Sequence, residues 1–101
     1  MERIVIRYRL RPAEVERNLE LVRGVYAERE ATGPGDFRYA TLGLGDGVSF
    51  VVVAVAPALP GPLPGLAAFR AYRERMEDRC EERFADAATL VGSYRMLGQR
   101  P

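Results

Sequence analysis

Two arginines in a strand-like segment near the start of the sequence have the type and spacing to bind an anion. Residues 4–12 read IVIRYRLRP, in which apolar side chains alternate with Arg7 and Arg9. Alternation with a period of two places both arginines on one face of a strand. A guanidinium stays charged and offers paired donors to carboxylate or enolate oxygens. Arg7 and Arg9 are therefore candidates for holding a small anionic or aromatic ligand.

The same face of the sheet is expected to carry further candidates for ligand binding. These are Tyr39, Thr41, Phe50 and Arg95. Tyr39 would donate a hydrogen bond to a bound oxygen or act as a weak acid. The alternative is ordinary interface packing, in which Tyr, Phe and Arg are enriched. For Arg7 and Arg9 the alternative is a position at the rim, either hydrated or paired across a dimer with Asp36, Asp46 or a helix carboxylate, because buried charge is costly unless it is paired.

Several kinds of catalysis are excluded by residues that the sequence lacks. It contains no histidine, and all 15 of its basic residues are arginine. An imidazole base, a histidine metal ligand and a lysine Schiff base are therefore excluded. The single cysteine, Cys80, lies between Met76 and Phe84 on an apolar stripe, so we expect it to be a small core residue. We expect no metal and no cofactor, and the catalytic base stays unassigned.

Length, charge and hydropathy narrow the remaining classes of function. The 101 residues are expected to form one domain, 1–101. The net charge of +1 argues against a nucleic-acid partner. The longest apolar run, VSFVVVAVA, is too short to span a bilayer, and the opening MERIVIRYRL lacks the pattern of a signal peptide. A cytoplasmic protein without a membrane partner is expected.

The periodicity of apolar residues predicts a β-α-β-β-α-β order. Strands are predicted at residues 3–10 and 88–97, and a hairpin over 36–56 turns at GDG, residues 45–47. A helix is predicted from Pro12 through residue 31, and a second from Leu66 to about Phe84. Right-handed crossovers then give a ferredoxin-like α+β sandwich. Its four-stranded antiparallel sheet has the order 4-1-3-2 and carries both helices on one face.

The third predicted strand, residues 48–56, is apolar on both of its sides. One side must face the helices, and the other would form an exposed apolar patch unless something covers it. A second copy of the chain is the simplest cover, which predicts a homodimer. The side chains expected to face the helices are Ile4, Ile6, Tyr8, Leu10, Ala40, Leu42, Leu44, Val51, Val53, Val55, Leu90, Tyr94 and Met96. Those expected on the opposite face are Val5, Arg7, Arg9, Phe37, Tyr39, Thr41, Phe50, Val52, Ser93 and Arg95.

In this order of elements the sequence resembles the dimeric α+β barrel superfamily, and within it the antibiotic biosynthesis monooxygenase-like proteins. The resemblance rests on the strand RIVIRYRLRP, the hairpin FRYATLGLGDGVSFVVVAVA, the helix LAAFRAYRERMEDRC and the closing VGSYRML. The resemblance extends over nearly the whole chain and is one of element order and residue pattern, because the family has no short diagnostic motif. It implies a homodimeric barrel in which two sheets face each other and enclose cavities.

The resemblance also implies two alternative functions. The first is cofactor-free oxidation or isomerisation of a small acidic aromatic or polyketide-like compound, with the arginines and Tyr39 holding an enolate or phenolate. The second is a non-catalytic small-molecule-binding or structural homodimer. Haem-degrading members of the superfamily use a histidine near the iron, and cofactor-free oxygenases often place a tryptophan in the pocket. This sequence has neither residue.

Overall fold

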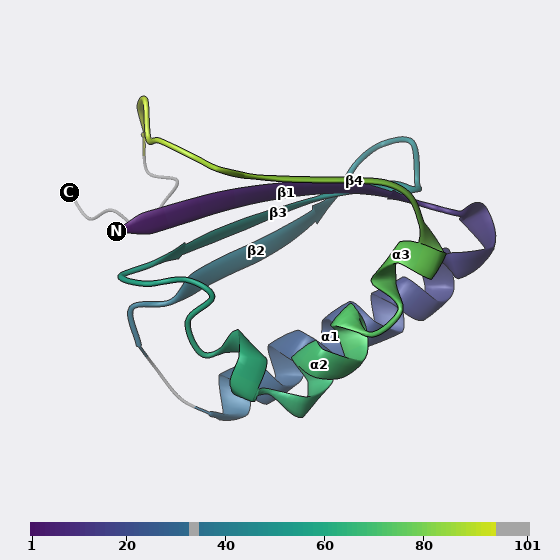
Figure 1. Cartoon of the computed structure of the whole chain (residues 1–101), viewed down its shortest axis with the longest axis horizontal. Coiled ribbons are helices and arrows are strands. Elements are labelled where there is room, and N and C mark those ends of the chain that lie inside the picture. Colours follow the sequence, from purple (N-terminus) through teal and green to yellow (C-terminus); the bar gives the residue numbers. More distant parts are fainter. Residues whose placement is uncertain (33–34, 95–101) are drawn as a thin grey trace.

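The described part of the chain folds into one antiparallel sheet, with its helices along a single face (Figure 1). The computed structural model describes residues 1–32 and 35–94. The elements are β1 (Glu2–Leu10), η1 (Pro12–Glu14), α1 (Val15–Ala31), β2 (Arg38–Gly43), β3 (Ser49–Ala56), η2 (Leu63–Gly65), α2 (Ala67–Arg73), α3 (Met76–Arg79) and β4 (Cys80–Ala87). The strand order β2-β3-β1-β4 is the predicted order 4-1-3-2 read from the other edge. The ferredoxin-like α+β fold is therefore confirmed.

The first strand and the first helix form as their sequence patterns predict. β1 pairs with β3 on one side and with β4 on the other, so it lies inside the sheet. Tyr8 and Leu10 point toward the helices and are almost fully buried. Pro12 opens the short η1 turn, and α1 continues to Ala31, the end predicted for this helix. Within residues 1–32 and 35–94, no helix has the length and apolarity that crossing a membrane requires.

The central hairpin forms as predicted, but its two faces are the reverse of the prediction. Across the sheet, Tyr8 lies beside Phe50 and Ile6 lies beside Val52. Because Thr41 pairs with Val52, the side chains of Phe37, Tyr39, Thr41, Phe50 and Val52 belong to the helix face. Those of Ala40, Leu42, Val51, Val53 and Val55 belong to the open face. Leu44 lies in the turn between β2 and β3 and is 38% exposed.

The physical reason for the reversal is that β3 is apolar on both sides, so its pattern does not distinguish them. The ring of Phe50 stacks on that of Tyr8, with centroids 5.4 Å apart, and this contact joins β3 to the core under the helices. A strand whose pairing shifts by one residue changes the face of every side chain. Because Phe50 was assigned to the wrong face, the other side chains of the hairpin were assigned to the wrong faces as well.

The second half of the chain departs most from the prediction. The helix predicted to run to Phe84 ends at Arg73, and the short α3 leads into β4 at Cys80. Arg75 has a φ of 58°, in the left-handed region that helices do not contain, and it separates α2 from α3. Met76, Cys80 and Phe84 recur every four residues, which imitates a helical stripe.

The strand predicted over residues 88–97 is wrong as far as the structure describes it. The fourth strand is β4, Cys80–Ala87, and pairing with β1 outweighs its local helical pattern. Residues 88–94 form no strand, and Tyr94, predicted to face the core, is 78% exposed. Leu90 is also exposed, and Ser93 is half-buried outside any strand. Arg95 and Met96 lie outside the described residues.

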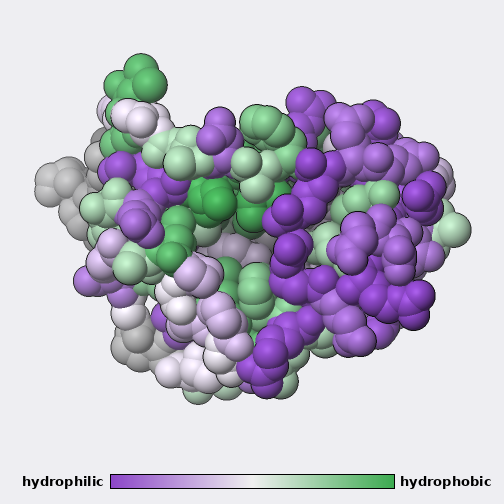
Figure 2. Space-filling view, viewed as in Figure 1, coloured by the Kyte–Doolittle hydropathy of each residue, from purple (hydrophilic) through white to green (hydrophobic). Residues whose placement is uncertain are grey.

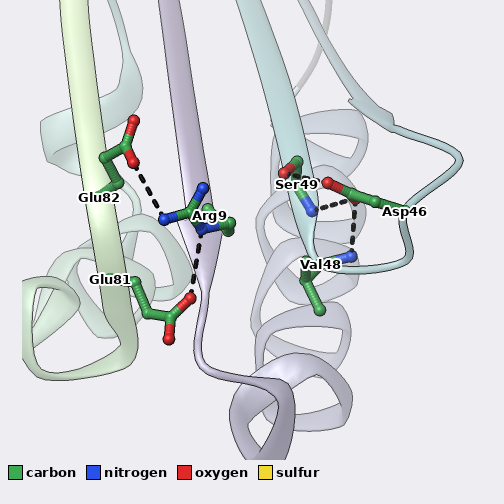
Figure 3. A network of polar contacts seen from close by, with 6 residues as sticks. All are labelled: Arg9, Asp46, Val48, Ser49, Glu81 and Glu82. Atoms are coloured by element: carbon green, nitrogen blue, oxygen red, sulfur yellow. Dashed lines mark hydrogen bonds and ion pairs between the residues drawn. The ribbon is translucent and has the colours of Figure 1, made fainter.

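A bulge in β4 gives Arg9 two carboxylate partners (Figure 3). Arg9 pairs across the sheet with Glu82 while Leu10 pairs with Cys80, so Glu81 is an extra residue in β4. Both glutamates therefore reach the same guanidinium. Arg9 Nε lies 3.2 Å from Glu81 Oε1, and Arg9 Nη2 lies 3.0 Å from Glu82 Oε2. These pairs are exposed, so each contributes about 0–1 kcal/mol to stability.

Candidate functional site

A cavity of about 270 Å³ lies between the helix face of the sheet and α2. Figure 2 shows the molecule hollowed in this region, with apolar side chains in green along the walls. The sheet contributes Ile4, Ile6, Val52 and Ala54, while α2 and the proline-rich loop before it contribute Leu59, Pro60, Leu63 and Phe69. The polar residues at its wall are Tyr39, Tyr72, Arg73 and Arg83. An apolar cavity with a few convergent polar groups is the usual form of a small-molecule site.

Two arginines bring positive charge to this cavity from different elements. Arg73 is the last residue of α2, and Arg83 lies in β4 on the helix face, opposite Tyr8 of β1. Both are exposed at the surface. Neither guanidinium forms an ion pair or hydrogen bond within the described part of the chain. Their charges are therefore available to an anion, in contrast to the charge of Arg9.

Tyr39 is held by a column of aromatic rings. Its ring stacks between Tyr26, at 5.2 Å, and Phe37, at 5.4 Å between centroids. The guanidinium of Arg29 lies over the outer ring of this column, 5.8 Å from the centroid of Phe37. Such contacts fix the orientation of the Tyr39 ring. Among the described residues its hydroxyl has no hydrogen-bond partner, so it is available to a ligand.

Tyr72 is held by hydrogen bonds instead of stacking alone. Its hydroxyl donates to the hydroxyl oxygen of Tyr8 over 3.1 Å, and Asn18 Nδ2 donates to the same oxygen over 3.0 Å. Tyr8 and Asn18 are fully buried, and Tyr72 is 5% exposed. This cluster joins α1, β1 and α2 behind the cavity. It fixes Tyr72 as one wall of the site.

Both tyrosines of the cavity remain protonated at neutral pH. Burial is the main cause that raises the pKa of Tyr39 and of Tyr72 well above the ordinary value of 10. The positive charge of Arg73 acts in the opposite direction on both but is a smaller effect. Neither tyrosine can therefore take a proton from a ligand at neutral pH. Each can form hydrogen bonds with one.

The structure brings one of the six predicted ligand-binding residues to the cavity, namely Tyr39. Arg7 and Arg9 lie on the open face of the sheet, as predicted, with Arg9 paired to its two glutamates. Thr41 shares the helix face with Tyr39 and forms a hydrogen bond of 2.9 Å with the hydroxyl of Tyr26. Phe50 is a core residue against Tyr8, and Arg95 lies outside the described residues.

Arg9 has carboxylate partners in a neighbouring strand, which the predicted elements did not include. Glu81 and Glu82 were assigned to a helix, but they stand in β4 beside β1. Arg9 is paired, but its partners are Glu81 and Glu82 of β4 in the same chain and not Asp36, Asp46 or a helix carboxylate. Arg7 lies beside Val51 in the sheet, and its charge adds slightly to the lowering of the pKa of Asp46, whose main cause is the hydrogen bond from Ser49.

Asp46 closes the hairpin turn near these arginines (Figure 3). Its carboxylate accepts hydrogen bonds from the hydroxyl of Ser49 over 2.6 Å, and from the backbone N–H groups of Val48 and Ser49 over 3.0 and 2.8 Å. A side chain that binds its own turn in this way stabilises the turn. Asp46 therefore has a structural role beside the open face, separate from the cavity.

Sequence reasoning missed three of the four polar residues of the cavity. Tyr72 and Arg73 stood within the helix predicted from Leu66 to about Phe84 and were not among the predicted ligand-binding residues. Arg83 stood within the segment mistaken for the end of that helix. A pairing of Cys80–Ala87 with β1 would have revealed Arg83, because its alternate residues Arg83 and Ala85 share the helix face with Tyr8.

No group of three or more metal-ligating side chains occurs among the described residues.

Comparison with solved structures identifies proteins of the same fold. A proposed antibiotic biosynthesis monooxygenase from Nitrosomonas europaea is 18% identical, with a TM-score of 0.70 over 91% of this chain and 100% of that chain. SnoaB, a cofactor-independent oxygenase from Streptomyces nogalater, is 17% identical, with a TM-score of 0.58 over 93% of this chain and 96% of that one. A NIPSNAP domain protein from Burkholderia xenovorans is 13% identical, with a TM-score of 0.60 over 90% and 95%.

The sequence itself matches no family model and no curated protein. The structural likeness nevertheless extends over nine-tenths of the chain and nearly all of each relative. It agrees with the order of strands and with the placement of both helical segments on one side of the sheet. The resemblance inferred from the sequence is thus confirmed in its architecture: the chain has the fold of the antibiotic biosynthesis monooxygenase-like proteins.

Proposed function

We propose that the cavity beside α2 binds a small acidic aromatic or polyketide-like compound and supports its cofactor-free oxidation or isomerisation. The observation that carries this proposal is the pair Arg73 and Arg83, which stand at an apolar cavity and have no acidic partner among residues 1–32 and 35–94. The apolar walls suit an aromatic ring, and the guanidinium groups suit its anionic oxygen. The likeness to SnoaB supports an oxygenase of this type.

In the proposed reaction the bound substrate gives its proton to water, without a general base from the protein. Tyr39 and Tyr72 stay protonated, and arginine does not accept a proton at neutral pH. The two guanidinium charges instead stabilise the enolate or phenolate and so lower the pKa of the bound substrate. Tyr39 donates a hydrogen bond to the anion.

The oxidation balances without a cofactor, because the ionised substrate is itself the reductant of dioxygen. One oxygen atom becomes a carbonyl oxygen on the reacting ring carbon. The other leaves as water, with the two hydrogens that the substrate loses from that carbon and from its hydroxyl. Where no dioxygen reacts, return of the proton at another carbon gives the isomerisation.

Ionisation of a bound probe tests this proposal. A hydroxynaphthoquinone, which changes colour when it loses its proton, should bind with its pKa lowered by about one unit relative to water. The reason is that two nearby cations favour the anion more than the apolar walls disfavour it. The measurement is a spectrophotometric pH titration of the bound probe, with dioxygen uptake followed in the same samples.

The control is Arg23→Leu, which removes an exposed arginine of α1 and should leave the titration unchanged. A bound probe whose pKa rises above its value in water would overturn the proposal, since burial alone has that effect. Binding with a lowered pKa but without dioxygen uptake from any hydroquinone would favour the alternative of a non-catalytic binding protein.

We also propose that the open face of the sheet is the interface of a homodimer. Leu42 and Phe84 are 56% and 64% exposed, and both lie in one row across the sheet with Val51 and Arg7. In the next row, Val53 lies between Ala40 and Val5. Apolar surface of this extent is normally covered in a soluble protein. An identical sheet in a second copy would cover it and leave Arg9 with its glutamates toward the polar rim.

A further inference from the structure

The two tyrosines of the cavity differ in whether their hydroxyl groups can donate a hydrogen bond to a ligand. Both line its wall, from β2 and from α2. The hydroxyl of Tyr39 has no partner in the described part of the chain. The hydroxyl proton of Tyr72 already forms a hydrogen bond, because the geometry makes Tyr72 the donor to the oxygen of Tyr8. A hydroxyl group carries one proton, so Tyr72 has no second one for a ligand.

Tyr8 and Asn18 form a buried cluster behind Tyr72, in which the oxygen of Tyr8 is the acceptor. The oxygen of Tyr8 receives hydrogen bonds from Asn18 Nδ2 and from Tyr72, at 3.0 and 3.1 Å. Both Tyr8 and Asn18 are buried, at 1% and 0% exposure, and neither lines the cavity. Tyr8 is the hydrogen-bond partner of the Tyr72 hydroxyl among the described residues, and Tyr72 is the donor in that bond.

We propose that Tyr72 acts on a ligand as a hydrogen-bond acceptor, whereas Tyr39 acts as a donor, and that this pair selects the ligand by its own hydrogen-bonding groups. The proposal rests on the cavity being the ligand site, as argued above. The ligand that fits carries an anionic oxygen for the arginines and a separate hydroxyl or amino group that donates to Tyr72. Tyr8 and Asn18 are positioning residues, because they touch Tyr72 and not the ligand.

A matched pair of ligands measures this selectivity. A hydroxynaphthoate and the corresponding methoxynaphthoate share the ring and the carboxylate, but only the first can donate a hydrogen bond. Wild-type protein should bind the hydroxyl compound about fivefold more tightly, as expected for one net hydrogen bond. The ratio of the two dissociation constants, from calorimetry or fluorescence, is the quantity to compare among variants.

Two variants separate the acceptor role from a general effect on the cavity. Tyr72→Phe removes the acceptor, so the preference for the hydroxyl compound should disappear. Tyr8→Phe leaves Tyr72 in place but takes away the acceptor of its proton. Tyr72 can then donate to the oxygen of either ligand, so the preference for the hydroxyl compound should fall toward equal binding. Tyr94→Phe, which removes an exposed hydroxyl far outside the core, should keep the wild-type ratio.

The outcomes distinguish this inference from the proposed function. If wild-type protein binds neither naphthoate, the proposed function fails. If it binds both and Tyr72→Phe keeps the wild-type ratio, the ligand is held in the cavity but Tyr72 is not its acceptor, and the inference fails. An unchanged ratio in folded Tyr8→Phe protein contradicts the positioning role. Should Tyr8→Phe not fold, as circular dichroism would show, the Tyr72→Phe ratio still decides.

Discussion

Replacing Arg73 and Arg83 together by leucine should weaken binding of a hydroxynaphthoate about a hundredfold, with each single replacement weakening it about tenfold. A hydrogen bond to a charged group contributes roughly 1.5–3 kcal/mol, and about 1.4 kcal/mol is a factor of ten in affinity. We take the lower end because both arginines are exposed and solvent screens their charge. Leucine keeps much of the side-chain volume, so the loss reports on charge.

The dependence of binding affinity on salt concentration tests the same interaction independently. Binding by wild-type protein should weaken as the salt concentration rises, and binding by the double variant should depend on salt much less. Arg23→Leu on the exposed side of α1 provides the matched control and should bind like wild type. Equal affinity in the double variant and in wild type would show that the anion is held elsewhere.

Val53→Asp should convert the proposed homodimer into a monomer, raising its dissociation constant at least about a hundredfold. Val53 lies in the central strand β3 on the open face, between apolar neighbours in β1 and β2. In a sheet-to-sheet dimer the new carboxylate would be buried without a partner, which costs about 3–5 kcal/mol. The measurement is light scattering or sedimentation of each variant over a range of concentrations.

Two further variants make the dimer test independent of any damage to the monomer. Leu42→Asp changes a side chain that is 56% exposed in the single chain, so the monomer should tolerate it while the dimer should not. Ala27→Asp puts the same charge on the exposed side of α1 and should leave the dimer intact. Wild-type protein that is monomeric at micromolar concentration would contradict the dimer outright.

The architecture was predictable because its signals are local and agree with one another. Strong alternation in β1, the apolar stripe of α1 and the GDG turn each predicted one element, and the right-handed crossover rule fixed the strand order. None of these predictions depends on which residues pair across the sheet. The faces of β2 and β3 do need that knowledge, and they were assigned wrongly.

The site was less predictable because its residues meet only through tertiary pairing. Arg83 reaches the cavity because Cys80–Ala87 pairs with β1, against a local pattern that favours a helix. Arg73 reaches it because α2 ends there, before Arg75 takes up a left-handed conformation. Tyr39 was expected on the open face beside Arg7 and Arg9, and it reaches the cavity from the helix face because the faces of the hairpin are the reverse of the prediction.

The central claim is that the ligand binds between α2 and the sheet, with its anionic oxygen at Arg73 and Arg83. A crystal structure with a bromine-substituted hydroxynaphthoate tests this most directly, because anomalous scattering locates the bromine without ambiguity. We expect bromine among the apolar side chains of the cavity, and a carboxylate oxygen within hydrogen-bond distance of at least one of the two guanidinium groups. Bromine on the open face of the sheet, beside Arg7 and Arg9, would contradict it.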